Sequence, residues 1–154
     1  MTAEIISIDL ADEQATMALG ARLAGVLRGG DVVRLSGDLG AGKSMLARGA
    51  IRALAGVSDA PSPTFTFVET YETSAFPLWH FDFYRLETPA DVWELGLEEA
   101  LENGAVLMEW PERVEGVLGE EGLLIRLEIA GGGRRALLYP DPSWKRRLST
   151  AGII

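Results

Sequence analysis

The chain has 154 residues, of which 47% are hydrophobic, and it carries a formal net charge of −9. We expect it to form one soluble, cytoplasmic domain, because its length suits a single core and no apolar stretch is long enough to cross a membrane. The absence of cysteine excludes disulfides and thiolate metal sites.

The charge is unevenly distributed along the chain. Residues 87–121 hold eleven acids and one base, a net charge of −10. This acidic block is interpreted either as a solvated face or as a docking surface for a basic partner. The last 21 residues contain five bases, which is compatible with contact with an acidic protein or RNA but lacks the density of a nucleic-acid-binding domain.

The hydrophobic pattern predicts alternating strands and helices. In chain order, the predicted elements are a strand at 4–8, a helix at 12–27, a strand at 31–36, a helix at 45–54, strands at 65–71 and 78–84, helices at 88–95 and 97–102, strands at 105–110, 123–129 and 135–139, and a helix at 144–148. Two strand pairs, 65–71 with 78–84 and 123–129 with 135–139, are spaced as hairpins. The predicted class is therefore α/β, with a central sheet of mixed parallel and antiparallel strands.

A glycine-rich segment between the strand at 31–36 and the following helix carries the strongest chemical signal. Residues 37–44 read GDLGAGKS, which matches the phosphate-binding loop G-x-x-x-x-G-K-[ST] in the strand-loop-helix context it requires. Backbone N–H groups of such a loop surround phosphate oxygens, and the helix N-terminus adds partial positive charge. Lys43 would reach the β- and γ-phosphates of a nucleotide, and the Ser44 hydroxyl would bind Mg²⁺.

A phosphate-binding loop also needs a carboxylate at the end of a nearby strand to hold Mg²⁺ or orient water. Asp82 and Glu109 both end apolar strands, and we expect both to converge on the metal and its waters; the alternative for each is an ordinary acid at a strand end. Strand alternation puts His80, Asp82 and Tyr84 on one face, which suggests that this face lines a site. His80, the one histidine, cannot build a metal site alone and is expected to be a packed or hydrogen-bonded residue.

Four further residues each have two possible interpretations. Ser62 and Thr64 stand where a switch loop would sense the γ-phosphate, but their prolines also suit an ordinary turn. Arg85 either touches phosphate or pairs with a carboxylate. Trp110 is expected to be a core residue rather than a stacking platform.

Missing motifs narrow the class of nucleotide-binding protein. The chain has no N-K-x-D sequence for a guanine pocket and no L-S-G-G-Q sequence of an ABC-type ATPase. Between Arg52 and the C-terminal strands the only bases are Arg85 and Arg113, whereas a small-molecule kinase needs several arginines to hold two sets of phosphates.

The motifs together resemble the TsaE (YjeE) family, the small P-loop ATPases of bacterial tRNA threonylcarbamoyladenosine biosynthesis. The resemblance extends from about residue 16 to residue 113. It rests on TMALG at 16–20, GDLGAGKS at 37–44, SPTF at 62–65, HFDFYRL at 80–86, ELGL at 94–97 and EWPER at 109–113. The family usually has Thr where this chain has Ser44, and both residues supply the metal-binding hydroxyl.

The resemblance implies a three-layer, P-loop NTPase-like fold and a weak, Mg²⁺-dependent ATPase activity that partner proteins increase. The implied partners are the threonylcarbamoyl-transferase catalytic subunit and its inactive paralogue, with tRNA involved indirectly, and the chain alone is expected to be a monomer. ATP hydrolysis would drive cycles of this assembly rather than transfer the carbamoyl group. The open alternatives are a small-molecule kinase and a nucleotide-sensing module without useful turnover.

The resemblance also implies roles for individual residues. Lys43 would contact phosphate, Ser44 and Asp82 would hold Mg²⁺, and Glu109 would lie near the metal and the attacking water, although the two acids remain interchangeable by pattern. The expected catalytic residues are Lys43, Asp82 and Glu109, and the expected metal ligands are Ser44, Asp82 and Glu109. The expected nucleotide-binding residues are Thr16, Gly37, Asp38, Leu39, Gly40, Ala41, Gly42, Lys43, Ser44 and Met45.

Overall fold

The computed structural model describes residues 5–57, 60, 63, 66–119 and 122–154. Its strands are β1 (Ile6–Leu10), β2 (Val32–Ser36), β3 (Val68–Tyr71), β4 (Leu78–Asp82), β5 (Ala105–Glu109), β6 (Leu123–Ala130) and β7 (Gly133–Tyr139). Its α-helices are α1 (Glu13–Ala24), α2 (Lys43–Ala55), α3 (Leu97–Asn103), α4 (Glu115–Leu118) and α5 (Pro142–Thr150), with 3₁₀ turns η1 (Pro89–Leu95) and η2 (Pro111–Arg113).

All these strands form one mixed sheet, as predicted. Its strand order is β1-β7-β6-β2-β5-β4-β3. β2 pairs in parallel with β5 and β6, and β4 pairs in parallel with β5, whereas the β3–β4, β6–β7 and β1–β7 pairs are antiparallel. Both predicted hairpins are therefore confirmed.

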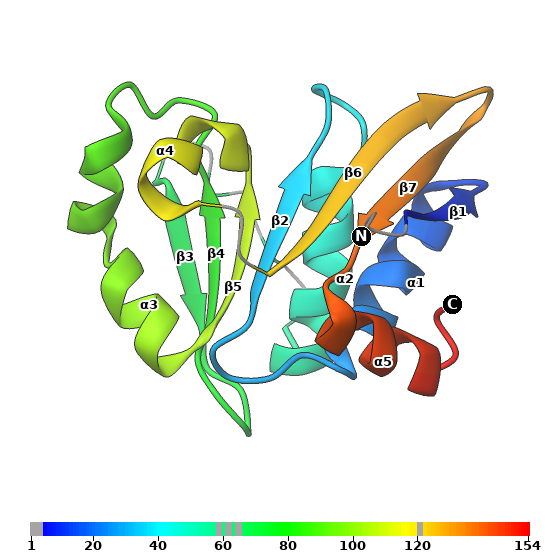
Figure 1. The fold of residues 1–154 in the computed structure, drawn as a ribbon, viewed down its shortest axis with the longest axis horizontal. Coiled ribbons are helices and arrows are strands. Elements are labelled where there is room, and N and C mark those ends of the chain that lie inside the picture. The colour runs from blue at the N-terminus through cyan, green and yellow to red at the C-terminus, as the bar shows by residue number, and fades with distance from the viewer. Residues whose placement is uncertain (1–4, 58–59, 61–62, 64–65, 120–121) are drawn as a thin grey trace.

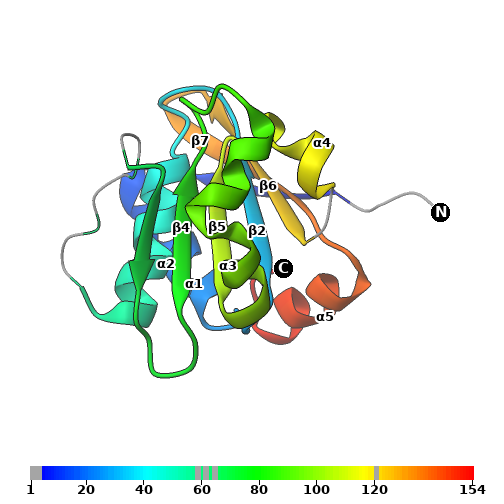
Figure 2. The same cartoon turned by 90° about the vertical axis from the view of Figure 1, so that its left-hand side faces the viewer.

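Helices cover both faces of the sheet and produce three layers (Figures 1 and 2). Alternation along β5 explains the two cores that result, because Ala105 and Leu107 pack with α1 and α2, whereas Val106 and Met108 pack under η1 and α3. Glu109, the next residue in the alternation, therefore points to the α2 side, toward the phosphate-binding loop.

The helices α1 and α2 approach each other closely through two glycines. A Cβ atom on Gly20 would lie 2.0 Å from the carbonyl oxygen of Leu46, and one on Gly49 would lie 2.1 Å from the carbonyl oxygen of Met17. This close packing fixes α2, and with it the loop that precedes it, against α1.

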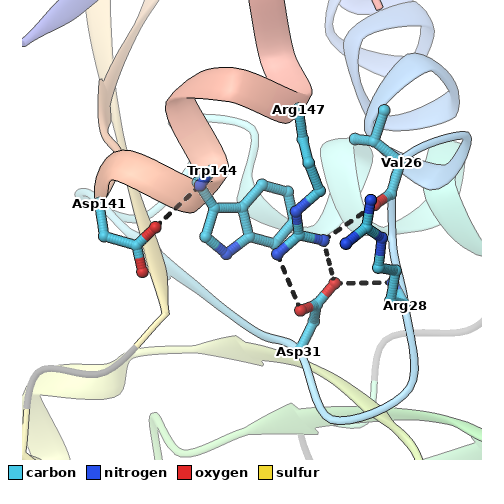
Figure 3. A network of polar contacts seen from close by, with 6 residues as sticks. All are labelled: Val26, Arg28, Asp31, Asp141, Trp144 and Arg147. Atoms are coloured by element: carbon cyan, nitrogen blue, oxygen red, sulfur yellow. Dashed lines mark hydrogen bonds and ion pairs between the residues drawn. The ribbon is translucent and has the colours of Figure 1, made fainter. Parts of the chain in front are cut away.

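The C-terminal helix α5 is held by an ion pair at the start of β2 (Figure 3). Arg147 donates to both carboxylate oxygens of Asp31, at 2.6 and 3.0 Å, and to the carbonyl of Val26 at 3.0 Å. Its guanidinium carbon lies 3.9 Å from the ring centroid of Trp144. Asp31 precedes β2 and the phosphate-binding loop follows it, so this clamp and the loop lie at opposite ends of the strand.

Several predicted bounds are corrected. The first helix ends at Ala24, and the strand predicted at 78–84 ends at Asp82, where its pairing with β5 stops. The helix predicted after Thr88 is a 3₁₀ turn, and the Thr88 side chain does not cap it. No helix within the described part of the chain is long and apolar enough to cross a membrane.

Candidate functional site

The phosphate-binding loop connects the carboxyl end of β2 to the first turn of α2. Gly37 has φ of 135°, and a Cβ there would lie 2.4 Å from the carbonyl oxygen of Leu127. Gly42 has φ of 109°, in the left-handed region, immediately before α2 begins at Lys43. Both positions therefore need glycine, which accounts for the spacing of the motif.

Lys43 is buried at the start of α2 and is bound by its own loop. Its Nζ donates to the carbonyl oxygen of Gly37 and, at 3.0 Å, to that of Asp38. The same atom lies 4.1 Å from the centroid of the Trp110 ring, in a cation–π arrangement. Burial lowers the pKa of Lys43, and the nearby carboxylates, led by Glu109, oppose that shift. A polyanionic ligand would replace these contacts with neutral carbonyls by contacts with oxygens of opposite charge.

The strand register brings the two predicted acids together. Asp82 of β4 is the registered partner of Glu109 of β5, and both side chains are buried. The Ser44 hydroxyl donates to Glu109 Oε1 at 2.8 Å, while Asp82 Oδ1 accepts from the Tyr84 N–H at 3.0 Å. One hydroxyl and two carboxylates thus meet beside the loop.

These groups fit a Mg²⁺ ion that arrives with a nucleotide. Among the described residues, no three His, Asp or Glu side chains cluster closely enough to hold a metal by themselves. Mg²⁺ commonly binds through one or two carboxylates, waters and substrate phosphates rather than an all-protein cage. Ser44, Asp82 and Glu109 supply hard oxygen ligands of that kind.

His80 lies behind this cluster on β4. It is 2% exposed, and its Nε2 lies 2.7 Å from Glu109 Oε2. The expectation of a hydrogen-bonded histidine is met, and its partner is one of the two predicted site acids.

A cleft of about 670 Å³ opens over the loop and reaches well beyond it. Its walls include the expected residues Thr16, Leu39, Gly40, Gly42, Lys43, Ser44, Met45, Asp82 and Glu109. Of the other expected residues, Gly37 and Asp38 contribute the carbonyls that bind Lys43, and Ala41 packs into the core.

Two segments that were not expected at the site also line the cleft, namely the start of α1 and the β6–β7 turn, with Ala11, Asp12, Glu13, Gly132, Gly133 and Arg134. Tyr84, which strand alternation placed on the face expected to line a site, lines the cleft together with Trp110. Arg134 Nη2 donates to the carbonyl of Gly40 at 3.0 Å, which links the β6–β7 turn to the phosphate-binding loop. The glycine run before Arg134 and the N-cap residue Asp12 marked these segments as a turn and a helix start, but nothing local indicated that they meet.

Trp110 packs against the core under η1 and α3, in line with the expectation, but it is half-buried and also lines the cleft wall. Its backbone has φ of 60°. Its ring lies 4.9 Å from that of Tyr84, centroid to centroid. Trp110 and Tyr84 together form an aromatic wall beside Lys43.

The structure does not test the expected switch role of Ser62 and Thr64, and it does not decide between the two interpretations of Arg85. Ser62 and Thr64, the predicted switch residues, lie outside the described residues. Arg85 is exposed and is not among the described residues that line the cleft.

The chain is similar to known proteins over most of its length. Residues 10–137 match the family model described as "Threonylcarbamoyl adenosine biosynthesis protein TsaE". The chain is 39% identical over 127 residues to the protein named "tRNA threonylcarbamoyladenosine biosynthesis protein TsaE" from Rickettsia felis, covering 82% of this chain and 74% of the relative. The namesake from Bacillus subtilis is 35% identical over 127 residues, covering 82% and 79% of the two chains.

The fold is also similar to that of a solved structure. The crystal structure of Bacillus subtilis YdiB superposes with a TM-score of 0.81 and 26% sequence identity, covering 99% of this chain and 97% of that one. The family match spans the phosphate-binding loop, both acids and the β6–β7 turn. The chain therefore belongs to the TsaE family of threonylcarbamoyladenosine biosynthesis proteins.

Proposed function

We propose that this protein binds ATP and Mg²⁺ in the cleft, hydrolyses ATP slowly alone, and thereby drives cycles of a multiprotein complex that modifies tRNA. The observation that carries this proposal is the contact between the Ser44 hydroxyl and Glu109, beside the glycine-rich loop and Lys43. This contact sets a carboxylate beside a hydroxyl that is suited to a nucleotide-bound metal, next to the loop that would hold the phosphates.

Each residue has a stated task in this proposal. Lys43 leaves the carbonyls of its own loop and binds the β- and γ-phosphates. Ser44 and Asp82 contribute oxygen ligands to Mg²⁺, which supplies charge neutralisation for the phosphates when bound. Glu109 orients the attacking water, a task that suits a carboxylate already held by two protein contacts.

The other end of the cleft suits the nucleoside part of ATP. The start of α1 and the β6–β7 turn also line the cleft and extend it past the phosphate-binding loop. Thr16 lines the cleft as well and lies close to the loop, because a Cβ added at Gly42 would be 3.5 Å from its methyl group. Arg134 adds a positive charge at the loop, the only arginine among the described residues lining the cleft.

We assign the partners to the same pathway. The proposed partners are the threonylcarbamoyl-transferase catalytic subunit and its inactive paralogue, and membership of a threonylcarbamoyladenosine biosynthesis family supports this choice. A single arginine near the phosphates suits an ATPase that needs other proteins to reach full activity.

An ATPase assay with and without the two partner proteins tests the proposal. We expect slow hydrolysis by the chain alone, faster hydrolysis with both partners, and loss of both rates in Lys43→Ala. If the partners leave the rate unchanged, the chain is a nucleotide-sensing module. If mass spectrometry finds the γ-phosphate on a small acceptor, the chain is a kinase.

A further inference from the structure

His80 stands directly behind Glu109, outside the residues described as lining the cleft. Both residues are 2% exposed, and Nε2 of His80 lies 2.7 Å from Glu109 Oε2. The register places His80 opposite Leu107 on β5, two residues before Glu109, so alternation puts both side chains on the same face.

Glu109 is consequently held at both carboxylate oxygens. Oε1 accepts from the Ser44 hydroxyl at 2.8 Å, and Oε2 faces His80. An ionised carboxylate only accepts hydrogen bonds, so the contact requires the proton on Nε2 of the imidazole. Two consecutive hydrogen bonds therefore connect Ser44 in the phosphate-binding loop, through Glu109, to His80 in the interior.

Packing alone does not explain a histidine at this position. Its Nδ1 is buried and has no hydrogen-bond partner in the structure. Burying a polar atom without a hydrogen-bond partner is unfavourable. A leucine of similar volume would fill the same space and have no polar atom to bury. The contact with Glu109 is what the imidazole adds over an apolar side chain.

We propose that His80 is a positioning residue that fixes the Glu109 carboxylate against Ser44 before Mg²⁺ and nucleotide arrive. A glutamate side chain has several rotatable bonds, and two contacts at its two oxygens restrict it to one orientation. Carboxylates and ligands near a metal depend on such outer partners for orientation. The benefit for turnover rests on the proposed ATPase function, whereas the contact itself does not.

The contact is tested first without nucleotide. His80 is the only histidine in the chain, so a ¹⁵N-labelled sample gives one imidazole spin system in a two-dimensional NMR spectrum. At a fixed pH we expect a protonated Nε2, and we expect its resonance to move in Glu109→Gln. An unprotonated Nε2, or a resonance unaffected by Glu109→Gln, would overturn the proposal.

Two substitutions of His80 then separate positioning from packing. His80→Leu keeps the volume and removes the donor, whereas His80→Gln keeps an amide donor. We expect His80→Leu to lower the turnover number about tenfold, with the KM for ATP and the midpoint of thermal unfolding little changed. We expect His80→Gln to recover most of the rate. Equal rates in the two variants would contradict the proposal.

A double-mutant cycle completes the test. Because His80 acts through Glu109, His80→Leu should cause no further loss in a Glu109→Ala background. An equal loss in both backgrounds would show that His80 acts independently. Failure of the proposed function would instead appear as absent ATP hydrolysis by the unmodified chain with its partners, and the NMR result would still decide whether His80 holds Glu109.

Discussion

The Ser44 hydroxyl lies 2.8 Å from Glu109 Oε1, which joins the first turn of α2 to the end of β5. The two residues are 65 positions apart in the chain. They meet because β2, the strand that leads into the loop, pairs in parallel with β5, which ends at Glu109. This hydrogen bond places a carboxylate at the hydroxyl that we propose as a Mg²⁺ ligand.

Substitutions of Asp82 and Glu109 should have different effects and so distinguish the roles of the two acids. We expect Asp82→Ala to weaken Mg²⁺-dependent nucleotide binding more than Glu109→Ala does, because Glu109 is already engaged by Ser44 and His80 and is suited to orienting water. Glu109→Ala should mainly slow turnover. Nucleotide titrations with and without Mg²⁺, together with single-turnover rates, check this assignment. The reverse order would exchange the two roles.

The buried lysine should make stability depend on pH. Burial lowers the pKa of Lys43 from its ordinary value of 10.5, so above the folded-state pKa the unfolded chain holds more protons at this residue. Between the folded-state pKa and 10.5, Lys43 therefore makes the free energy of unfolding increase as the pH rises, so the folded protein becomes more stable.

The measurement compares the unmodified chain with Lys43→Met, both free of nucleotide and Mg²⁺. The difference in urea-derived free energy of unfolding, unmodified minus variant, should increase with pH below 10.5. A flat or falling difference would show that the lysine is not destabilised by burial.

The clamp on α5 should contribute to stability without affecting catalysis. Arg147→Met removes the two-pronged contact with Asp31 and leaves that carboxylate largely buried, at 13% side-chain exposure. We expect a loss of about 2 kcal/mol in the free energy of unfolding. ATP turnover at 25 °C should be unchanged, because the clamp and the loop lie at opposite ends of β2.

The neighbouring Arg146 provides the control for that experiment. Arg146 is exposed on the same helix, and Arg146→Met should change stability by about 0.5 kcal/mol or less. If both variants unfold at the same urea concentration, the contact with Asp31 adds nothing to stability.

The close packing of α1 on α2 should tolerate no added methyl group. In Gly20→Ala the new Cβ would stand 2.0 Å from the Leu46 carbonyl oxygen, so the helices must separate, and we expect a loss of about 3 kcal/mol. Gly116→Ala in α4 is the matched control, since no atom lies within 4 Å of its added Cβ. Thermal unfolding of both variants measures the difference, and a similar midpoint for both would contradict the packing argument.

By itself, the sequence determined the local elements and the chemistry of the loop. The glycines at 37 and 42 permit backbone angles that other residues rarely adopt, and the hydrophobic alternation of β4 and β5 assigns each side chain to a face. These are properties of neighbouring residues, which is why the loop, both acids and the mixed sheet were all predicted.

Only the tertiary structure decided which other distant residues join the loop and the two acids. The β4–β5 register brings His80 to the Glu109 carboxylate, and the β6–β7 turn delivers Arg134 to Gly40 across 94 residues. Trp110 enters the cleft wall because the chain turns sharply after β5. Which strands far apart in the chain become neighbours depends on burial across the whole sheet, so a local pattern in the sequence does not decide it.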